Sequence, residues 1–193
     1  ALQPNSPDGY TLSAIADISQ KQFSSADADL KQALQVAPRA PTVYVQLGNL
    51  RLAQKKYPEA EKAFHQALES DPNSSDALGG VMRTELAQQQ TDAAIAAANE
   101  QIAKSPSNSS FYDLLGTALF NNKKDLAGAE AALSKATQLD SHNSDAWLKL
   151  GQVQVARGST DQAIASLQQA VAANPGVSRF YVLIGQLYES KHD

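Results

Sequence analysis

Residues 41–74 read PTVYVQLGNLRLAQKKYPEAEKAFHQALESDPNS, and this stretch decides the fold. Apolar side chains recur at residues 44, 47 and 50 and again at 60, 63, 64, 67 and 68, which is the spacing of amphipathic helices. The polar stretch 54–56 separates the two series. Pro72 lacks a backbone donor and clashes with the preceding helical turn, so a helix must end before it. The stretch therefore predicts two short helices joined by a tight turn.

The same pattern recurs along the chain with a period of 34 residues. Three series of residues keep this period: Pro4, Pro38, Pro72, Pro106 and Pro175; Ala26, Ala60, Ala94, Ala129 and Ala163; and Gly48, Met82, Gly116, Gly151 and Gly185. The series share one extra residue in the fourth repeat, and Ser141 stands where a proline is missing. Such self-similarity is typical of repeat proteins, in which each helix pair buries its apolar face against its neighbours.

The chain resembles the tetratricopeptide repeat (TPR) family, whose 34-residue unit is a helix–turn–helix. Residues 41–74 match best, at the fourth, seventh, eighth, seventeenth, twentieth, twenty-fourth, twenty-seventh and thirty-second positions: Tyr44, Leu47, Gly48, Tyr57, Ala60, Phe64, Ala67 and Pro72. The resemblance implies an all-α fold, a right-handed α-α superhelix (solenoid) of antiparallel helix pairs. The expected organisation is the end of a preceding repeat at 1–6, repeats at 7–40, 41–74, 75–108, 109–143 and 144–177, and the first helix of a further repeat at 178–193.

The third and fourth repeats depart from this pattern. The third carries Met82 where glycine is usual, Ala98 where phenylalanine is usual and Gln101 where alanine is usual. We interpret the first two as a volume exchange, in which the flexible methionine fills room that the small alanine leaves. The extra residue of the fourth repeat falls within 121–128, and we expect it in the turn between the two helices, because loops tolerate insertions.

Both ends of the sequence fall inside a repeat. The last expected helix carries Val182, Leu183, Ile184, Leu187 and Tyr188 on several of its faces, whereas a terminal repeat needs a polar outer face. We therefore expect a fragment of a longer array, or a chain whose ends meet another molecule. Self-association through the open ends is a further expectation.

The composition excludes several classes of site and partner. The 193 residues include no cysteine, which removes disulfides, thiolate metal sites and cysteine nucleophiles. Sixteen Lys and Arg against twenty Asp and Glu give a net charge of −4, the wrong sign for neutralising phosphates, so we expect no nucleic-acid partner. No apolar stretch approaches the ~18 residues that cross a bilayer. We therefore expect a soluble chain without direct membrane insertion.

The sequence carries no motif for catalysis, metal binding or a cofactor. The three histidines, His65, His142 and His192, have no second ligand at a metal-binding spacing. The one glycine pair, Gly79 and Gly80, lies inside an expected helix instead of after a strand. We therefore expect solvated histidines, no cofactor and no enzyme activity in this chain.

The TPR resemblance implies a concave groove lined by the first helix of each repeat, at its second, fifth, ninth, twelfth and thirteenth positions. From these positions we select as candidate partner-binding residues Asn49, Leu52, Asp76, Arg83, Leu86, Asp113, Thr117, Phe120, Asp145, Gln152 and Val155. The same positions also hold Val45, Gly79, Leu148, Arg179, Val182 and Gln186. The apolar residues at the twelfth position, Ile18, Leu52, Leu86, Phe120 and Val155, either line the groove or pack between neighbouring repeats, and the sequence supports both readings equally.

We predict a non-catalytic protein–protein interaction scaffold that binds a peptide or a helix of a partner in this groove. Apolar side chains on a mildly acidic wall suit a partner with apolar and basic side chains. The alternatives are the recruiting arm of an enzyme whose catalytic domain lies outside these residues, and a module of a bacterial export or cell-envelope assembly system. The compartment is not fixed by the sequence, but its cysteine-free composition, rich in Ala, Gln and Ser, favours the bacterial periplasm or cell envelope slightly over the cytoplasm.

Overall fold

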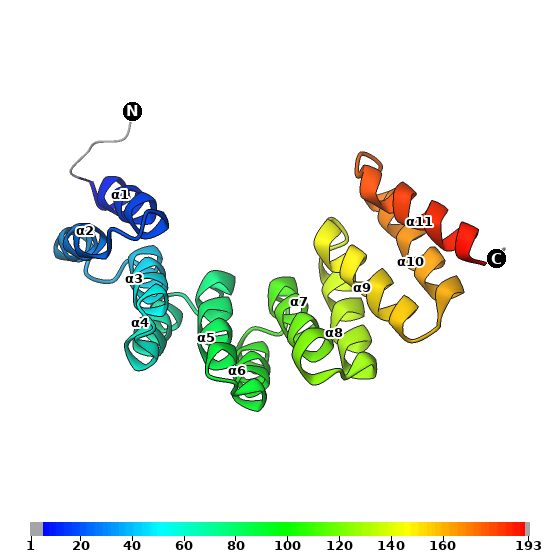
Figure 1. Ribbon diagram of the computed structural model, residues 1–193, viewed down its shortest axis with the longest axis horizontal. Coiled ribbons are helices and arrows are strands. Elements are labelled where there is room, and N and C mark those ends of the chain that lie inside the picture. Colours follow the sequence, from blue (N-terminus) through cyan, green and yellow to red (C-terminus); the bar gives the residue numbers. More distant parts are fainter. Residues whose placement is uncertain (1–5, 192–193) are drawn as a thin grey trace. The chain divides into compact units, whose positions relative to one another are not determined.

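The computed structural model describes residues 6–191, and all regular structure in that range is helical (Figure 1). The chain divides into two compact units, Ala1–Ser105 and Pro106–Asp193. The first unit contains α1 (Pro7–Ser19), α2 (Phe23–Val36), α3 (Pro41–Ala53), α4 (Tyr57–Ser70), α5 (Ser75–Ala87) and α6 (Thr91–Lys104). The second contains α7 (Ser109–Ala118), the π-helical turn η1 (Leu119–Lys123), α8 (Leu126–Leu139), α9 (Ser144–Ala156), α10 (Thr160–Ala173) and α11 (Ser178–Ser190).

Within each unit the helices are arranged in consecutive pairs, α1–α2, α3–α4 and α5–α6 in the first and α7–α8 and α9–α10 in the second. This confirms the predicted all-α fold of helix pairs. The first helices of the pairs begin at residues 7, 41, 75, 109 and 144, and α11 begins at 178. We propose that the repeats run between these starts. The expected repeat remnant at 1–5, together with His192 and Asp193, lies outside the described residues.

One residue with a left-handed backbone ends the first helix of each pair. These residues are Lys21, Lys55, Gln89, Lys124 and Gly158, with φ between 58° and 76°. In the third repeat, the backbone N–H of the following residue, Gln90, donates to the carbonyl of Glu85 (2.9 Å), which closes the helix end. This conformation costs little for glycine but is strained for the other four residues.

The extra residue of the fourth repeat lies at the end of the first helix and not in the turn that follows it. The left-handed residues Gln89 and Lys124 are separated by one residue more than their counterparts. Before Lys124 the helix widens into the π turn Leu119–Lys123, and the N–H of Asp125 donates to the carbonyl of Leu119 (3.1 Å). A π turn absorbs one additional residue while it keeps backbone hydrogen bonds. The expectation of an insertion in the connecting turn was therefore wrong.

Aromatic side chains close the junctions between successive repeats. Each donates a hydrogen bond to the backbone carbonyl six residues earlier: Tyr44 to Pro38 (2.9 Å), Tyr112 to Pro106 (3.1 Å), Trp147 to Ser141 (2.9 Å) and Tyr181 to Pro175 (3.2 Å). The third repeat has Leu78 at this position, which cannot donate. There the buried amide of Gln101 donates to the Pro72 carbonyl instead, at 2.5 Å. The unusual Gln101 thus satisfies a carbonyl that the unusual Leu78 leaves without its aromatic donor.

The buried apolar side chains of the two units form separate clusters. In the first unit one cluster is centred on Leu30 and Leu50, and another on Phe64 and Val81. The ring of Phe64 fills the space in which both Gly48 and Gly80 would carry a Cβ atom. The absence of a side chain at these two positions therefore lets α3, α4 and α5 approach closely.

Candidate functional site

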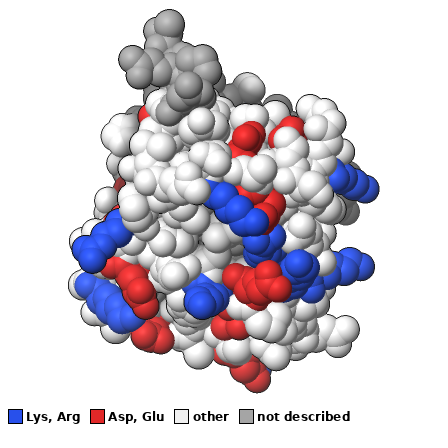
Figure 2. Space-filling view, turned by 90° about the vertical axis from the view of Figure 1, so that its left-hand side faces the viewer, with Lys and Arg blue, Asp and Glu red and all other residues white. Residues whose placement is uncertain are grey.

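Acidic and basic side chains are intermixed on one face of the molecule. Figure 2 shows one face of the molecule, on which Lys and Arg lie next to Asp and Glu and neither sign forms a large patch. Among the described residues there is no group of three His, Asp or Glu side chains that could hold a metal ion. Residues 6–191 also include no helix that is long and apolar enough to cross a membrane.

In the first unit, the groove candidates come from α3 and α5. The guanidinium of Arg83 donates to the Asn49 Oδ1 atom (3.2 Å), and the Asn49 amide in turn donates to Gln46 Oε1 (3.1 Å). The structure thus brings two predicted groove residues of successive repeats together. Asp76 is exposed in the first turn of α5, and Leu86 is half-buried.

In the second unit, Asp113 on α7 forms an ion pair with Lys149 on α9. The ammonium group lies 2.8 Å from both carboxylate oxygens, and only 17% of the Asp113 side chain is exposed. The Thr117 hydroxyl donates to the Asp113 carbonyl (2.7 Å), whereas Asp145 and Gln152 are exposed to solvent. Lys149, which the sequence prediction did not include, neutralises part of the expected acidic wall.

The apolar residues at the twelfth position mostly pack between repeats. Ile18, Leu52 and Phe120 are half-buried, and each packs against one of the apolar clusters of its own unit. Val155, at 39% exposure, is open to solvent. At the fifth position, the structure buries Val45. A large part of the predicted apolar stripe therefore stabilises the stack.

A shallow cavity of about 310 Å³ lies between α9 and α11. It is lined by Leu148, Gln152, Ser178, Arg179, Val182, Leu183 and Gln186. Five of these residues occupy the second, fifth or ninth positions of their helices. The cavity thus lies where first-helix positions of two successive repeats face each other.

Two of the polar contacts between successive repeats join residues that are 24 positions apart. Arg51 pairs with Asp27 (2.5 Å), and the Gln154 amide donates to Glu130 (3.1 Å), which also pairs with Arg157. A hydrogen bond from Lys31, aided by Arg51, lowers the pKa of Asp27 against the opposing effect of burial.

The third such pair, Glu61 with Glu85, has two like charges. The Gln88 amide donates to Glu61 (2.8 Å), but the Oε2 atom of Glu85 is buried without a hydrogen-bond partner among the described residues. Burial, and then repulsion from Glu61, raise the pKa of Glu85 from 4.5 to about 7. The sequence prediction missed this site, although the 24-residue spacing could have pointed to it.

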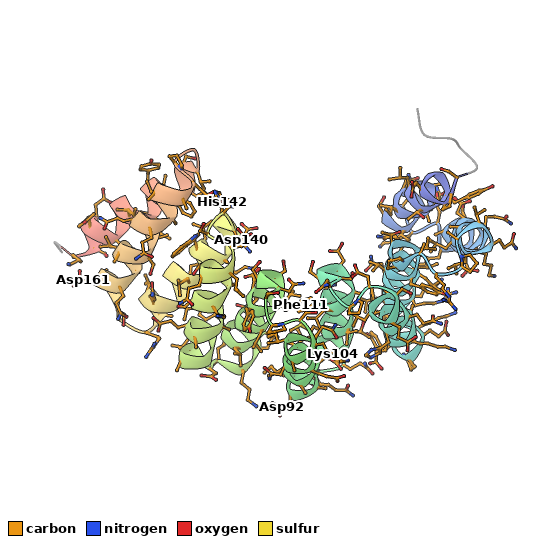
Figure 3. The ribbon with its side chains drawn as sticks, turned by 180° about the vertical axis from the view of Figure 1, so that it is seen from behind. Asp92, Lys104, Phe111, Asp140, His142 and Asp161 are labelled. Atoms are coloured by element: carbon orange, nitrogen blue, oxygen red, sulfur yellow. The ribbon has the colours of Figure 1, made fainter. Side chains whose placement is uncertain are left out.

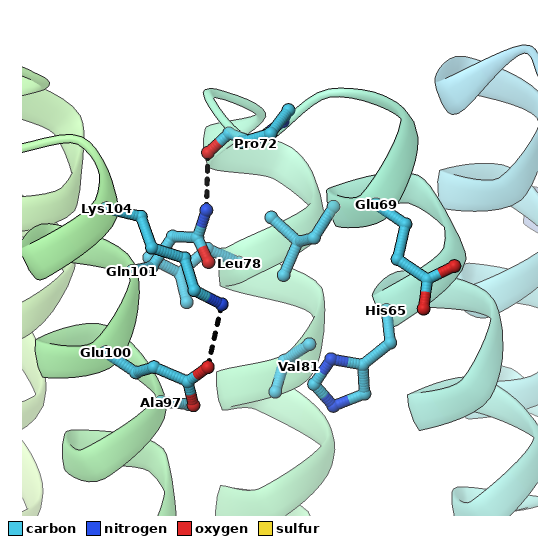
Figure 4. A pocket seen from close by; sticks show the side chains of 10 residues that line it. His65, Glu69, Pro72, Leu78, Val81, Ala97, Glu100, Gln101 and Lys104 are labelled. Atoms are coloured by element: carbon cyan, nitrogen blue, oxygen red, sulfur yellow. Dashed lines mark hydrogen bonds and ion pairs between the residues drawn. The ribbon is translucent and has the colours of Figure 1, made fainter.

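The two described histidines lie in different surroundings. His142 is exposed in the turn between α8 and α9, where its backbone N–H donates to the Asp140 carboxylate (2.9 Å; Figure 3). His65 lines a cavity of about 380 Å³ between α4 and α6, with α5 behind it (Figure 4). Leu78, Val81 and Ala97 contribute apolar surface to this cavity, which no sequence motif indicated.

Comparison with known proteins identifies the fold family. A family model described as "Tetratricopeptide repeat" matches residues 51–118 and 122–187, and a second model with the same description matches residues 12–79. The chain belongs to the tetratricopeptide repeat family. TPR arrays are protein–protein interaction scaffolds and are generally not catalytic, so the chain has the fold of an interaction scaffold.

Solved structures of TPR proteins are similar to this chain. The MamA protein is 28% identical with a TM-score of 0.60, over 79% of this chain and 82% of MamA. Pseudomonas aeruginosa pilF is 17% identical with a TM-score of 0.67, over 97% of this chain and 85% of pilF. YrrB, described as a TPR protein with an unusual peptide-binding site, is 20% identical with a TM-score of 0.56, over 91% of this chain and 90% of YrrB. A search of curated protein sequences gave no match.

Proposed function

We propose that this TPR chain is a non-catalytic scaffold that holds a peptide or helix of a partner protein against the first helices of its repeats. In the first unit the candidate contact residues are Asn49, Leu52, Asp76, Arg83 and Leu86. In the second unit they are Asp113, Thr117, Phe120, Asp145, Gln152 and Val155. A bacterial periplasmic or cell-envelope location remains a prediction from composition.

The cavity between α9 and α11 is the observation that carries this proposal. Its walls combine the apolar side chains of Leu148 and Val182 with the amides of Gln152 and Gln186. Such a surface can accept apolar side chains of a partner and hydrogen-bond its backbone at the same time. Val182 is 58% exposed and therefore accessible to a partner. The peptide-binding site described for YrrB, a protein of the same fold, agrees with this kind of function.

The test is selection of binding peptides followed by measurement of their affinity. A displayed random peptide library is selected on the intact chain, and the enriched peptides are titrated by calorimetry against wild type and variants. We expect Val182→Asp to weaken binding at least about tenfold, since it places a charge in an apolar contact. Val36→Asp is the matched control, because Val36 is 56% exposed on the second helix α2. If both variants bound every selected peptide with equal affinity, the hypothesis that the groove is the peptide-binding site would be rejected.

Arg83→Ala tests the first unit in the same assay. Arg83 is exposed and its hydrogen bond to Asn49 lies at the surface, so its loss should leave the fold intact. Phe120→Ala is less informative, because Phe120 packs against the apolar cluster of the second unit and its loss changes stability as well.

A further inference from the structure

The cavity beside His65 has a counterpart in the second unit, so the residues that line the two cavities can be compared position by position. A cavity of about 430 Å³ lies between α8 and α10, over α9. Its lining residues stand 69 positions after their counterparts, which is two repeats and the inserted residue. Both cavities lie between the second helices of successive repeats, away from the first-helix groove of the proposed function.

The two cavities differ in charge. Glu69 and Glu100 in the first unit correspond to Gln138 and Gln169 in the second, and Lys104 corresponds to Ala173. All residues that line the second cavity are described, and none is charged. The charge of the first cavity is therefore not a requirement of this packing arrangement.

The carboxylates stand on opposite sides of the first cavity. Glu69 comes from α4 and Glu100 from α6, with Leu78 and Val81 of α5 between them (Figure 4). Leu78 and Val81 line the base of the cavity, and because each is only 1% exposed they are held in place by the surrounding core. Among residues 6–191 Glu69 forms no ion pair, so its carboxylate is available to a further cation.

The cation already at the rim is weakly held. Lys104 pairs with Glu100 at 2.7 Å, and this pair lies within one helix at positions i and i+4. The two side chains are 55% and 70% exposed, and exposed pairs of this kind contribute little stability. The hydrogen bond from Lys104 also lowers the pKa of Glu100, which keeps this carboxylate ionised. A second cation can therefore share or replace Lys104 at small cost.

We propose that the cavity between α4 and α6 receives an arginine side chain of a partner protein. The aliphatic stem of the arginine would lie on Leu78 and Val81 while its guanidinium group lies between Glu69 and Glu100. Arginine suits this position because its planar cation is weakly hydrated and can donate to two carboxylates, while its stem buries apolar surface. Charge complementarity selects this occupant over an anionic or a purely apolar one.

The test titrates the full chain with N-acetyl-arginine amide and follows its backbone amide signals by NMR. Its neutral isostere, N-acetyl-citrulline amide, is the matched ligand. We expect saturable shifts at residues 65–69 and 97–104, with dissociation constants of order 1–10 mM for so small a ligand. Citrulline should bind at least about fivefold more weakly, because it lacks the charge.

Glu69→Gln and Glu100→Gln place the residues of the second cavity into the first. Each should weaken arginine binding about three- to tenfold. Glu189→Gln, which removes an exposed glutamate on α11, is the matched control and should change nothing. Circular dichroism verifies that all three variants are folded. The proposal is overturned if arginine and citrulline shift the same signals equally, or if both cavity variants bind arginine as tightly as the control.

Discussion

Replacement of Glu85 by glutamine should stabilise the chain above neutral pH and leave it nearly unchanged in acid. The carboxyl group has a buried oxygen that accepts no hydrogen bond within the described residues, it faces Glu61, and its pKa is raised from 4.5 to about 7. Between these two pH values the folded state binds more protons than the unfolded state, so stability falls as the pH rises through this window. Above pH 7 the full penalty of a charged Glu85 is present.

The size of the effect follows from the pKa difference. A rise from 4.5 to about 7 corresponds to at most about 3 kcal/mol, at about 1.4 kcal/mol for each tenfold change in the equilibrium. Because Glu85 is only half-buried, solvent screening reduces this to about 1–2 kcal/mol. We therefore expect Glu85→Gln to raise the free energy of unfolding by about 1–2 kcal/mol at pH 8 and by almost nothing at pH 4.5.

Urea unfolding followed by circular dichroism at pH 4.5, 6, 7 and 8 measures this difference. Glu189→Gln serves as the control for removal of an exposed negative charge. A second variant, Glu85→Arg, places opposite Glu61 the kind of charge that Arg51 places opposite Asp27. It should be more stable than wild type at pH 8. If Glu85→Gln stabilised equally at pH 4.5 and pH 8, or failed to stabilise at pH 8, the reasoning from burial and repulsion would be wrong.

Three single substitutions and one double variant test the packing and the turns by the same unfolding measurement. Met82→Gly should destabilise by roughly 2–4 kcal/mol, because it leaves a cavity in a core position that is 3% exposed; a neutral result would refute the volume exchange. Gly158→Ala should cost about 1 kcal/mol, because the residue has φ +76°, and an unchanged midpoint would show that the turn relaxes. Gln101→Ala should cost about 1–3 kcal/mol by leaving the Pro72 carbonyl without its donor, and adding Leu78→Tyr should restore much of that loss. If the double variant were no more stable than the single one, the introduced tyrosine would not be replacing the lost donor.

Local and periodic features of the fold could be predicted from the sequence. The helix pair in 41–74 follows from apolar spacing and from Pro72, both of which act within a few residues. The period then extends that pair to the rest of the chain, because every repeat repeats the same local signals. The position of the insertion could not be read in this way. Residues 119–123 form a π turn by a choice between two hydrogen-bond patterns, and the residues themselves favour neither strongly.

Contacts between repeats were the part that sequence reasoning missed. The pair of Gln101 with Pro72 joins residues 29 apart, and the pair of Lys149 with Asp113 joins residues 36 apart. Each depends on how one helix pair stacks on the next, which the 34-residue pattern does not specify. The candidate groove shows the same limit, because Val45 occupies a groove position but is 6% exposed. Its burial depends on the neighbouring repeat and not on its own helix.

The ring of Phe64 contacts the backbone of two glycines that belong to successive helix pairs, Gly48 on α3 and Gly80 on α5. Neither α3 nor α5 can separate from α4 without exposing part of that ring to water. In a linear array, fraying is expected to enter from an end and advance one pair at a time. The shared aromatic ring couples α3–α4 to α5, so fraying that reaches this point must open three helices in one step. The middle of the first unit should thus resist local opening better than a plain sum of its separate pairs would indicate.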